Sequence, residues 1–285
     1  MAVTVVETID GVRARLDEVR RAGHTVGFVP TMGALHEGHL SLARAAREAN
    51  DRVVVSIFVN PLQFAEDEDL GAYPRDLDHD LALCERVGVD VVFAPSVDEM
   101  YPTGPVATTV SVSGVSEGFE GATRPTHFAG VATVVAKLFS IVGPCAAYFG
   151  EKDFQQLAVV RRMAADLSMP VDVVGCPIVR EDDGLAMSSR NVYLGEAERA
   201  AAPVLQRALV TGRELVEGGE RDPAVVVAAM VAVVDAEPLA ELDYVAVVDA
   251  ATLEVPERLT GELRLLGAAR VGRPRLIDNV AARVD

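Results

Sequence analysis

The chain has 285 residues, few cysteines and no excess of positive charge. Its three cysteines, Cys84, Cys145 and Cys176, are far apart and form no CxxC pair. This spacing excludes a disulfide framework and favours structural thiols in a reducing compartment. The chain has 26 basic residues and 43 acidic residues, which gives a formal charge of -17. Nucleic acid and anionic membranes both require a basic footprint, so neither is expected as a general partner.

Long apolar stretches are also missing. The amino-terminal residues contain no basic segment followed by an apolar core, so no signal peptide is predicted. The longest apolar run, residues 224–234, is too short to span a bilayer and predicts a buried helix. Half of the residues are hydrophobic and 24% are charged, which is typical of a globular protein that needs no metal or disulfide to stabilise its core. We therefore expect a cytoplasmic protein.

Short β-branched runs alternate with helical patterns over the first two thirds of the chain. The expected strands are residues 26–29, 53–59, 89–93, 146–149 and 171–174. They are nearly all apolar, as strands buried on both faces are. The expected helices are residues 11–21 (with Asp10 as N-cap), 38–49, 76–87, 128–141 and 153–167. This alternation predicts an α/β fold with a parallel, doubly wound sheet.

The pattern changes after about residue 179. The expected elements there are helices at residues 196–217 and 223–235 and strands at residues 244–248, 263–269 and 275–278. Residues 270–274 join the last two strands, which predicts a hairpin. We therefore expect two domains, an α/β domain over residues 1–178 and a smaller α+β domain over residues 179–285.

The first polar cluster is PTMGALHEGH, residues 30–39, between a strand and a helix. Such a turn binds phosphate because backbone N–H groups and the helix dipole favour an anion. Gly33 would let the ligand approach the backbone, and Gly38 would leave room for a purine. His36 and His39 would share one face of the first helical turn, where two imidazole donors can stabilise a leaving pyrophosphate. A zinc site and a pair of structural histidines are the alternatives.

Amide and basic side chains form two further clusters. Asn60 and Gln63 follow the strand at residues 53–59, and ligands bind at the carboxyl ends of such strands. Their side chains donate and accept hydrogen bonds, which suits a hydroxy acid, although Asn-Pro is also an ordinary turn. Arg124, close in sequence to His127, is able to bind a carboxylate or phosphate with two hydrogen bonds.

A glycine and a helix start also follow the strand at residues 146–149. Lys152 suits a phosphate contact, and Asp153 suits either Mg²⁺ or a helix N-cap. Residues 187–190, Met-Ser-Ser-Arg, place two hydroxyls and a guanidinium on one loop, which suits either a polyphosphate clamp or a polar linker. Together the clusters predict a nucleotide site with room for a second substrate.

With these segments in this order, the chain resembles the pantothenate synthetase (pantoate–β-alanine ligase) family, which belongs to the HIGH-type nucleotidyltransferases. The resemblance is carried by PTMGALHEGH, VSIFVNPLQF, YPRDLDHDL, RPTHFAGV, FGEKDFQQL, DGLAMSSRN and a final LIDN. HEGH is similar to the HIGH motif, and MSSR is similar to the KMSKS loop. Another HIGH-type nucleotidyltransferase, an aminoacyl-tRNA synthetase and an ATP-sensing module are the alternatives.

The resemblance implies an enzyme that joins pantoate to β-alanine with ATP through a pantoyl-adenylate. The products are pantothenate, a coenzyme A precursor, together with AMP and pyrophosphate. It also implies Mg²⁺, a homodimer, and small-molecule substrates in place of nucleic acid or membrane. The domain over residues 1–178 would be Rossmann-like and would bind ATP and pantoate, and residues 179–285 would form a lid.

Site roles also come from the resemblance. It implies His39 as general acid, assisted by His36, and we expect Lys152 to bear phosphate charge. The residues expected to bind ATP are Met32, Gly33, Ala34, Leu35, His36, Glu37, Gly38, His39, Gly150, Glu151, Lys152, Asp153, Val179, Met187, Ser188, Ser189 and Arg190. The residues expected to bind substrate are Gln63, Gln156, Asn60, Arg124 and His127. Asp153 and Asp80 are the expected metal ligands, and His79 stands where relatives commonly carry an acidic residue.

Overall fold

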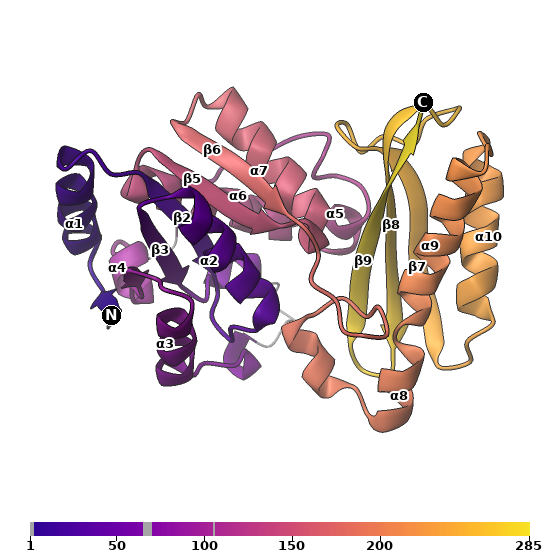
Figure 1. Ribbon diagram of the computed structural model, residues 1–285, viewed down its shortest axis with the longest axis horizontal. Coiled ribbons are helices and arrows are strands. Elements are labelled where there is room, and N and C mark those ends of the chain that lie inside the picture. Colours follow the sequence, from indigo (N-terminus) through magenta and orange to yellow (C-terminus); the bar gives the residue numbers. More distant parts are fainter. Residues whose placement is uncertain (1–2, 65–69, 105) are drawn as a thin grey trace. The chain divides into compact units, whose positions relative to one another are not determined.

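The computed structural model describes residues 3–64, 70–104 and 106–285, and the chain divides into two compact units. The first unit consists of Met1–Glu151 and Gln156–Pro177, and the second consists of Lys152–Gln155 and Ile178–Asp285 (Figure 1). The short segment Lys152–Gln155 therefore belongs with the carboxyl-terminal part of the chain, although its neighbours on both sides belong to the first unit.

A six-stranded sheet forms the centre of the first unit (Figure 1). Its strands are β1 (Thr4–Val6), β2 (Val26–Thr31), β3 (Arg52–Ile57), β4 (Val91–Phe93), β5 (Cys145–Gly150) and β6 (Val171–Cys176). Their order is β1-β4-β3-β2-β5-β6, and the paired neighbours run parallel. The strand order changes direction between β2 and β5, which is where ligands bind in doubly wound sheets. The predicted fold class is confirmed.

Helices cover both faces of this sheet. The helices of this part of the chain are α1 (Ile9–Arg21), α2 (Glu37–Ala49), α3 (Leu77–Arg86), α4 (Val97–Met100), α5 (Glu120–Thr123), α6 (His127–Val142) and α7 (Phe154–Asp166). Phe28 and Val54 pack in one apolar cluster with α1, α6 and α7, whereas Val29, Val53 and Val55 pack in another with α2 and α3. Successive strand residues face opposite sides, so a strand with helices on both sides needs an unbroken apolar run.

The second unit is a smaller α+β structure. Its antiparallel sheet has the order β7 (Ala240–Asp249), β8 (Gly261–Val271) and β9 (Arg275–Val284). Its helices are α8 (Glu196–Ala201), α9 (Val204–Glu217) and α10 (Pro223–Asp235). The predicted hairpin is confirmed, because Arg270 of β8 pairs with Arg275 of β9. Leu209, Met230 and Leu265 are buried in the core that α9, α10 and the sheet share.

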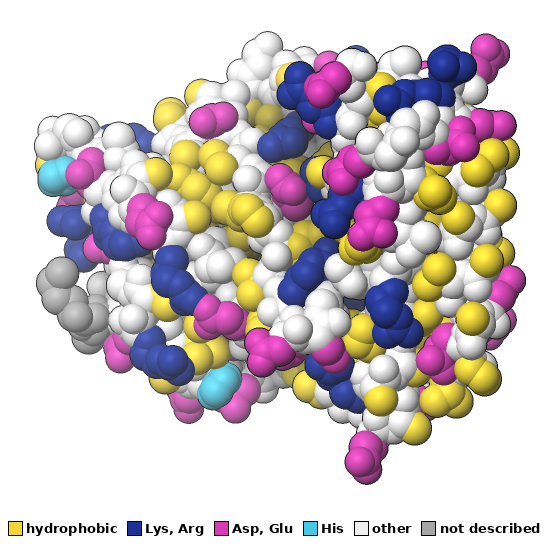
Figure 2. Space-filling view, turned by 45° about the vertical axis from the view of Figure 1, so that its right-hand side comes forward, with side chains coloured by type: hydrophobic (Ala, Val, Ile, Leu, Met, Phe, Trp, Pro, Cys, Tyr) yellow, Lys and Arg dark blue, Asp and Glu magenta, His cyan; other side chains and the backbone are white. Residues whose placement is uncertain are grey.

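Two predictions about helices of the second unit are wrong. The helix expected at residues 196–217 is two helices, because Pro203 lacks the N–H that a continuous helix would need. The run at residues 224–234 does form a helix, but α10 buries only Val226, Met230 and Val234, and Val225 is 45% exposed. Hydrophobic side chains also lie at the surface on the right-hand side of Figure 2.

Two predictions about the amino-terminal segment also need correction. Helix α1 begins at Ile9, and its N-cap is Thr8, whose hydroxyl accepts a hydrogen bond from Gly11 N at 3.2 Å; Asp10 lies inside the first turn. Strand β1 was not predicted, because three residues are too few to show a period. Among the described helices, none is both long and apolar enough to cross a membrane.

A buried ion pair joins β9 to the loop that precedes α8. Arg180 Nη1 lies 2.6 Å from Asp278 Oδ2, Arg180 Nη2 lies 2.9 Å from Asp278 Oδ1, and the Asp278 side chain is 5% exposed. Arg180 also donates to the carbonyl oxygens of Gly184 and Asn279. The last strand therefore fixes the loop that carries residues 180–184.

Replacing Asp278 by alanine is expected to lower the free energy of unfolding by about 3–5 kcal/mol, because a half-buried guanidinium would lose its partner. Urea denaturation followed by circular dichroism measures this change. Glu262→Ala is the matched control, because it breaks an exposed pair with Arg283 that should contribute about 1 kcal/mol or less. Equal losses in the two variants would contradict the stabilising role of the buried pair.

Candidate active site

Asp80 holds the glycine-bearing turn between β2 and α2. Its Oδ2 accepts a hydrogen bond from Ala34 N at 3.0 Å, and its Oδ1 accepts one from Leu35 N at 2.8 Å. Gly33 and Ala34 have φ of 84° and 50°, and a Cβ on Gly33 would lie 2.9 Å from Asp80 Oδ2. A glycine is therefore needed at position 33 both for the left-handed backbone and for the space beside Asp80.

The predicted metal role of Asp80 does not fit this geometry. The residue is 1% exposed, and backbone N–H donors lie on both of its oxygens. Burial raises the pKa of Asp80 above its usual value, and the hydrogen bonds from Leu35 and Ala34 oppose that shift. The described residues contain no cluster of three or more His, Cys, Asp or Glu side chains able to hold a metal ion. Asp80 is therefore a positioning residue for the turn.

His36 and His39 lie side by side at the start of α2, with ring centroids 4.2 Å apart. His36 Nδ1 accepts a hydrogen bond from Gly38 N at 3.2 Å, and His36 N donates to His39 Nδ1 at 3.3 Å. An Nδ1 that accepts carries no proton, so each neutral ring is protonated on Nε2. The histidines cap the helix as well as lining its first turn. The space left by Gly38 is taken by the His36 ring, whose Cε1 would lie 2.9 Å from an added Cβ.

The predicted substrate residues around Gln63 come together at the end of β3. Asn60 caps the short 3-10 helix η1 (Pro61–Gln63), and its Nδ2 donates to Gln63 Oε1 at 3.0 Å. The main-chain oxygen of Gln63 accepts from Arg124 Nη2 at 3.2 Å and lies 3.0 Å from His127 Nδ1. Asn60 is fully buried and Gln63 is 9% exposed. Arg124 and His127 therefore hold the main chain at Gln63.

Sequence reasoning missed two residues of this cluster. Tyr101 donates its hydroxyl to Asn60 Oδ1 at 2.8 Å, and burial raises the pKa of Tyr101 to about 12. Gly130 of α6 lies against η1, because a Cβ there would be 2.0 Å from the Leu62 carbonyl oxygen. The signal for Gly130 was a glycine inside an otherwise apolar helix, which often marks close packing. No sequence pattern pointed to Tyr101.

Three adjacent strands bring predicted residues to one edge of the sheet. The turn at residues 32–36 follows β2, η1 follows β3, and Gly150 ends β5, with Glu151 directly after it. Gln156 lies on α7, which begins soon after β5. Because carboxyl ends of parallel strands meet at the same edge, these residues share the side of the sheet on which such folds bind ligands.

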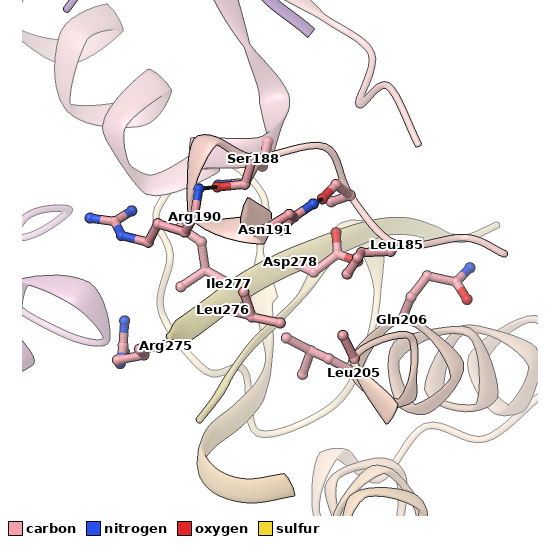
Figure 3. Close-up of a pocket in the computed structure, with 13 residues that line it drawn as sticks. Leu185, Ser188, Arg190, Asn191, Leu205, Gln206, Arg275, Leu276, Ile277 and Asp278 are labelled. Carbon is pink, nitrogen blue, oxygen red and sulfur yellow. Dashed lines mark hydrogen bonds between the residues drawn. The ribbon is translucent and has the colours of Figure 1, made fainter. Parts of the chain in front are cut away.

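Lys152 lines a pocket within the second unit (Figure 3). Its main-chain oxygen accepts a hydrogen bond from Asn279 Nδ2 at 2.9 Å, its Nζ lies 3.5 Å from Asp153 Oδ1, and its side chain is 18% exposed. The other polar lining residues are Ser188, Arg190, Asn191, Gln206, Arg275 and Asp278. Two predicted phosphate-binding residues, Ser188 and Arg190, are thus brought to the same pocket as Lys152.

Arg275 adds a third cation that the sequence did not single out. Its Nε and Nη2 each lie 2.7 Å from Asp243 Oδ2, and its guanidinium lies 5.9 Å from the ring centre of Tyr244. Figure 3 shows Arg190 and Arg275 extending on the same side of the pocket. Three cations and the Asp278 carboxylate therefore line this small pocket.

The loop at residues 187–190 is hydrogen-bonded to the segment that precedes it in the sequence. Met187 N donates to the carbonyl oxygen of Val179 at 3.0 Å, which places Val179 beside this loop. The Ser188 hydroxyl accepts from Arg190 N at 3.3 Å and caps the short 3-10 helix η4 (Ser189–Tyr193). The loop is therefore an ordered element.

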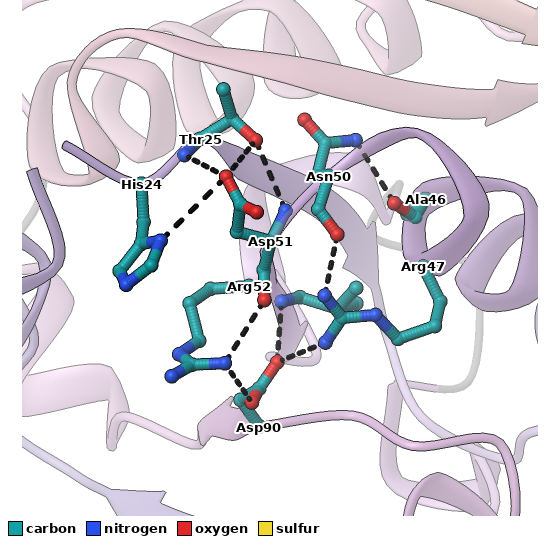
Figure 4. A network of polar contacts seen from close by, with 9 residues as sticks. His24, Thr25, Ala46, Arg47, Asn50, Asp51, Arg52 and Asp90 are labelled. Atoms are coloured by element: carbon teal, nitrogen blue, oxygen red, sulfur yellow. Dashed lines mark hydrogen bonds and ion pairs between the residues drawn. The ribbon is translucent and has the colours of Figure 1, made fainter.

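A different polar network lies at the opposite, amino-terminal ends of β2 and β3 (Figure 4). Asp51 Oδ2 accepts from Thr25 N at 2.8 Å and from Thr25 Oγ1 at 2.9 Å, and these bonds lower its pKa. Asp51 therefore stabilises the fold at pH values above its unfolded-state pKa of 3.8. This contribution is lost as the pH falls from 3.8 through the lower pKa of the folded state. Asp90 accepts from Arg47 Nη1 and from Val53 N. These contacts connect the amino-terminal ends of neighbouring strands, so the role of this network is structural.

Comparison with known proteins shows similarity over nearly the whole chain. The family described as pantoate-β-alanine ligase matches residues 4–281. A pantothenate synthetase of Heliobacterium modesticaldum is 59% identical over 280 residues, covering 98% of this chain and 99% of that protein. One of Moorella thermoacetica is 53% identical over 281 residues and covers 99% of each.

Solved structures agree. Pantothenate synthetase from Thermus thermophilus has a TM-score of 0.92 at 51% identity, over 98% of this chain and 99% of that one. A pantoate-β-alanine ligase from Francisella tularensis, complexed with beta-gamma ATP and β-alanine, has a TM-score of 0.80 at 32% identity, over 98% of this chain and 97% of that one. From its sequence and its fold, the chain belongs to the pantoate-β-alanine ligase family.

Proposed function

We propose that this enzyme joins pantoate to β-alanine with ATP through a pantoyl-adenylate, which serves the biosynthesis of pantothenate. The observation that best supports the proposal is that two different polar clusters lie at the carboxyl ends of the neighbouring strands β2 and β3. The turn after β2 suits phosphate, and the amide cluster after β3 suits a hydroxy acid. The complex of the Francisella tularensis relative supports ATP and β-alanine as ligands.

In the first step, a carboxylate oxygen of pantoate attacks the α-phosphorus of ATP, and the bond from that phosphorus to the pyrophosphate oxygen breaks. Two anions meet, so the enzyme must neutralise charge and orient the reactants. We assign His36 and His39 to the leaving pyrophosphate, with His39 as the general acid. Their Nε2–H tautomer supports this role, because that nitrogen can donate to a phosphate oxygen.

Further residues are assigned to ATP. In the second unit, Lys152, Ser188 and Arg190 line one pocket, which supports their assignment to the phosphates. Asp153, whose side chain is 47% exposed, is the carboxylate that fits Mg²⁺, a cation that proteins usually bind through one or two carboxylates together with substrate phosphates. When bound there, Mg²⁺ would supply further positive charge for the phosphates.

In the second step, the amine of β-alanine attacks the carbonyl carbon of the adenylate. An amide bond forms and AMP leaves with the oxygen that bridged carbon and phosphorus. We assign Gln63 and Gln156 to pantoate, with Gln63 also near β-alanine. The homodimer, the cytoplasmic location and the lid role of residues 179–285 stay predictions.

An omission series tests the proposal. With ATP, pantoate and β-alanine present, we expect AMP, pyrophosphate and amide in equal amounts. Without β-alanine, pyrophosphate should appear only up to the amount of enzyme, and without pantoate it should not appear. Release of ADP and orthophosphate, or a dinucleotide product formed without an amine, would assign the chain to different chemistry.

Replacing Asp80 by asparagine is expected to raise the KM for ATP by about 10-fold or more, because an amide has one oxygen and its NH₂ would face one of the two N–H donors of the turn. Steady-state kinetics measure this change, and thermal denaturation shows whether the fold is kept. Asp78→Asn is the matched control, since Asp78 is exposed on the same helix. Equal KM values in the two variants would remove Asp80 from the positioning of the turn.

A further inference from the structure

A buried chain of hydrogen bonds ends on the side chain of Gln63. The Tyr101 hydroxyl donates to Asn60 Oδ1 at 2.8 Å, and Asn60 Nδ2 donates to Gln63 Oε1 at 3.0 Å. Tyr101 directly follows α4 and lies 41 positions from Asn60 in the sequence. The network therefore connects a segment outside the predicted substrate cluster with the residue assigned to pantoate.

Main-chain groups set the direction of this hydrogen-bond chain. Asn60 Oδ1 accepts from Leu62 N at 3.3 Å, and Asn60 Nδ2 donates to the carbonyl oxygen of Gly130 at 3.2 Å. A main-chain N–H can only donate and a carbonyl can only accept, so the Asn60 amide has one favourable orientation. Gln63 must then turn its Oε1 toward Asn60, which directs its Nε2 amino group away from Asn60.

Tyr101 is itself held in place. Lys137 of α6 donates to the carbonyl oxygen of Met100, and its Nζ lies 5.4 Å from the centre of the Tyr101 ring. The Phe58 ring packs edge-on at a centroid distance of 6.0 Å. Because burial raises the pKa of Tyr101 to about 12, its hydroxyl remains a donor at neutral pH. The donor at the start of the hydrogen-bond chain is thus fixed in both position and protonation.

We propose that Tyr101 is a positioning residue for pantoate: through Asn60 it locks Gln63 so that its amino group, and not its oxygen, is presented to the hydroxy acid. This inference rests on the proposed function. An amino group can donate to a carboxylate or hydroxyl oxygen, whereas an inverted amide would present an oxygen and repel a carboxylate. The hydrogen-bond chain therefore selects a substrate oxygen that accepts a hydrogen bond.

Tyr101→Phe tests this role. The variant removes the shortest of the bonds that orient the Asn60 amide and keeps those with Leu62 N and the Gly130 carbonyl oxygen, so joint inversion of the two amides becomes less unfavourable. We expect the KM for pantoate to rise about 5-fold or more, with kcat and the KM for ATP changed by less than about twofold. Tyr148→Phe is the matched control, because it removes another 2.8 Å bond between a tyrosine hydroxyl and an asparagine, Asn50, in the same unit.

Asn60→Asp provides a second, independent test. A carboxylate still accepts from Tyr101 and Leu62 but cannot donate to Gln63 or to the Gly130 carbonyl oxygen. Gln63 should therefore turn its amino group toward position 60 and its oxygen toward the substrate. We expect a larger rise in the KM for pantoate than in Tyr101→Phe. Adding Tyr101→Phe to Asn60→Asp should then change the KM little further, because the lock is already lost.

Two results would overturn the inference. One is a KM for pantoate in Tyr101→Phe that matches the value in Tyr148→Phe while both variants unfold at the temperature of the unmodified enzyme. The other, which also decides the question if Tyr101→Phe does not fold, is an unchanged KM for pantoate in Asn60→Asp. Failure of the proposed function is distinguishable, because the unmodified enzyme would then show no pantoate-dependent release of pyrophosphate.

Discussion

Replacing Lys152 by alanine is expected to slow adenylate formation by about 10²-fold or more, as the loss of other preorganised charge-stabilising donors does. Lys152 shares its pocket with Ser188, Arg190 and Arg275, and Asn279 fixes its main chain. The cation is therefore held in place before the negative charge of the leaving pyrophosphate develops. Rapid-quench measurement of pyrophosphate, with ATP and pantoate in a single turnover, gives this rate directly.

Two further variants separate charge from position at Lys152. Lys152→Arg keeps the charge but changes its geometry, so it should recover only part of the rate. Arg162→Ala removes an exposed cation of α7, whose side chain is 64% exposed, and should change the rate by less than about twofold. A loss of less than about threefold in Lys152→Ala would exclude Lys152 from the charge stabilisation described above.

Replacing Gly130 by alanine is expected to lower kcat/KM for pantoate by about 10²-fold, because small displacements of positioning groups have effects of this size. The added Cβ would lie 2.0 Å from the Leu62 carbonyl oxygen and 3.0 Å from Gln63 N, so η1 must move away from α6. That movement would break the bond from Asn60 to the Gly130 carbonyl oxygen, which helps to orient the Asn60 amide. The free energy of unfolding should also fall by about 1–3 kcal/mol, as in other overpacked sites.

Steady-state kinetics and thermal denaturation measure the two effects of Gly130→Ala. Gly118→Ala is the matched control, because nothing lies within 4 Å of a Cβ added there. It should leave both quantities nearly unchanged. Unaltered kcat/KM in Gly130→Ala would show that the close approach of α6 to η1 does not position Gln63.

The central strands could be predicted from sequence because burial on both faces leaves a plain signal. Residues 53–55 are all valine and all buried, since successive residues pack against helices on opposite sides of the sheet. The signal is weaker elsewhere. Strand β1 has three residues, and the valine-rich sequence of α10 is apolar all round, so its composition does not show which face is covered.

The candidate site was predictable where it depends on local sequence and strand ends. The turn at residues 32–36 and the amides of Asn60 and Gln63 follow apolar strands, and a parallel sheet places such ends at one edge. What was missed depends on contacts between distant residues. Asp80 lies 46 positions from Ala34, and Tyr101 lies 41 positions from Asn60. Neither contact follows from residue type or local period, so the sequence did not show that Asp80 holds the turn.

The most direct test of the account follows an oxygen atom from pantoate to AMP. Pantoate labelled with ¹⁸O in both carboxylate oxygens should transfer one label to AMP and keep the other in the amide carbonyl, because the attacking oxygen leaves with the α-phosphorus. Mass spectrometry of the isolated products measures both labels. Unlabelled ADP with the label in orthophosphate would show activation at the terminal phosphate and would contradict the pantoyl-adenylate.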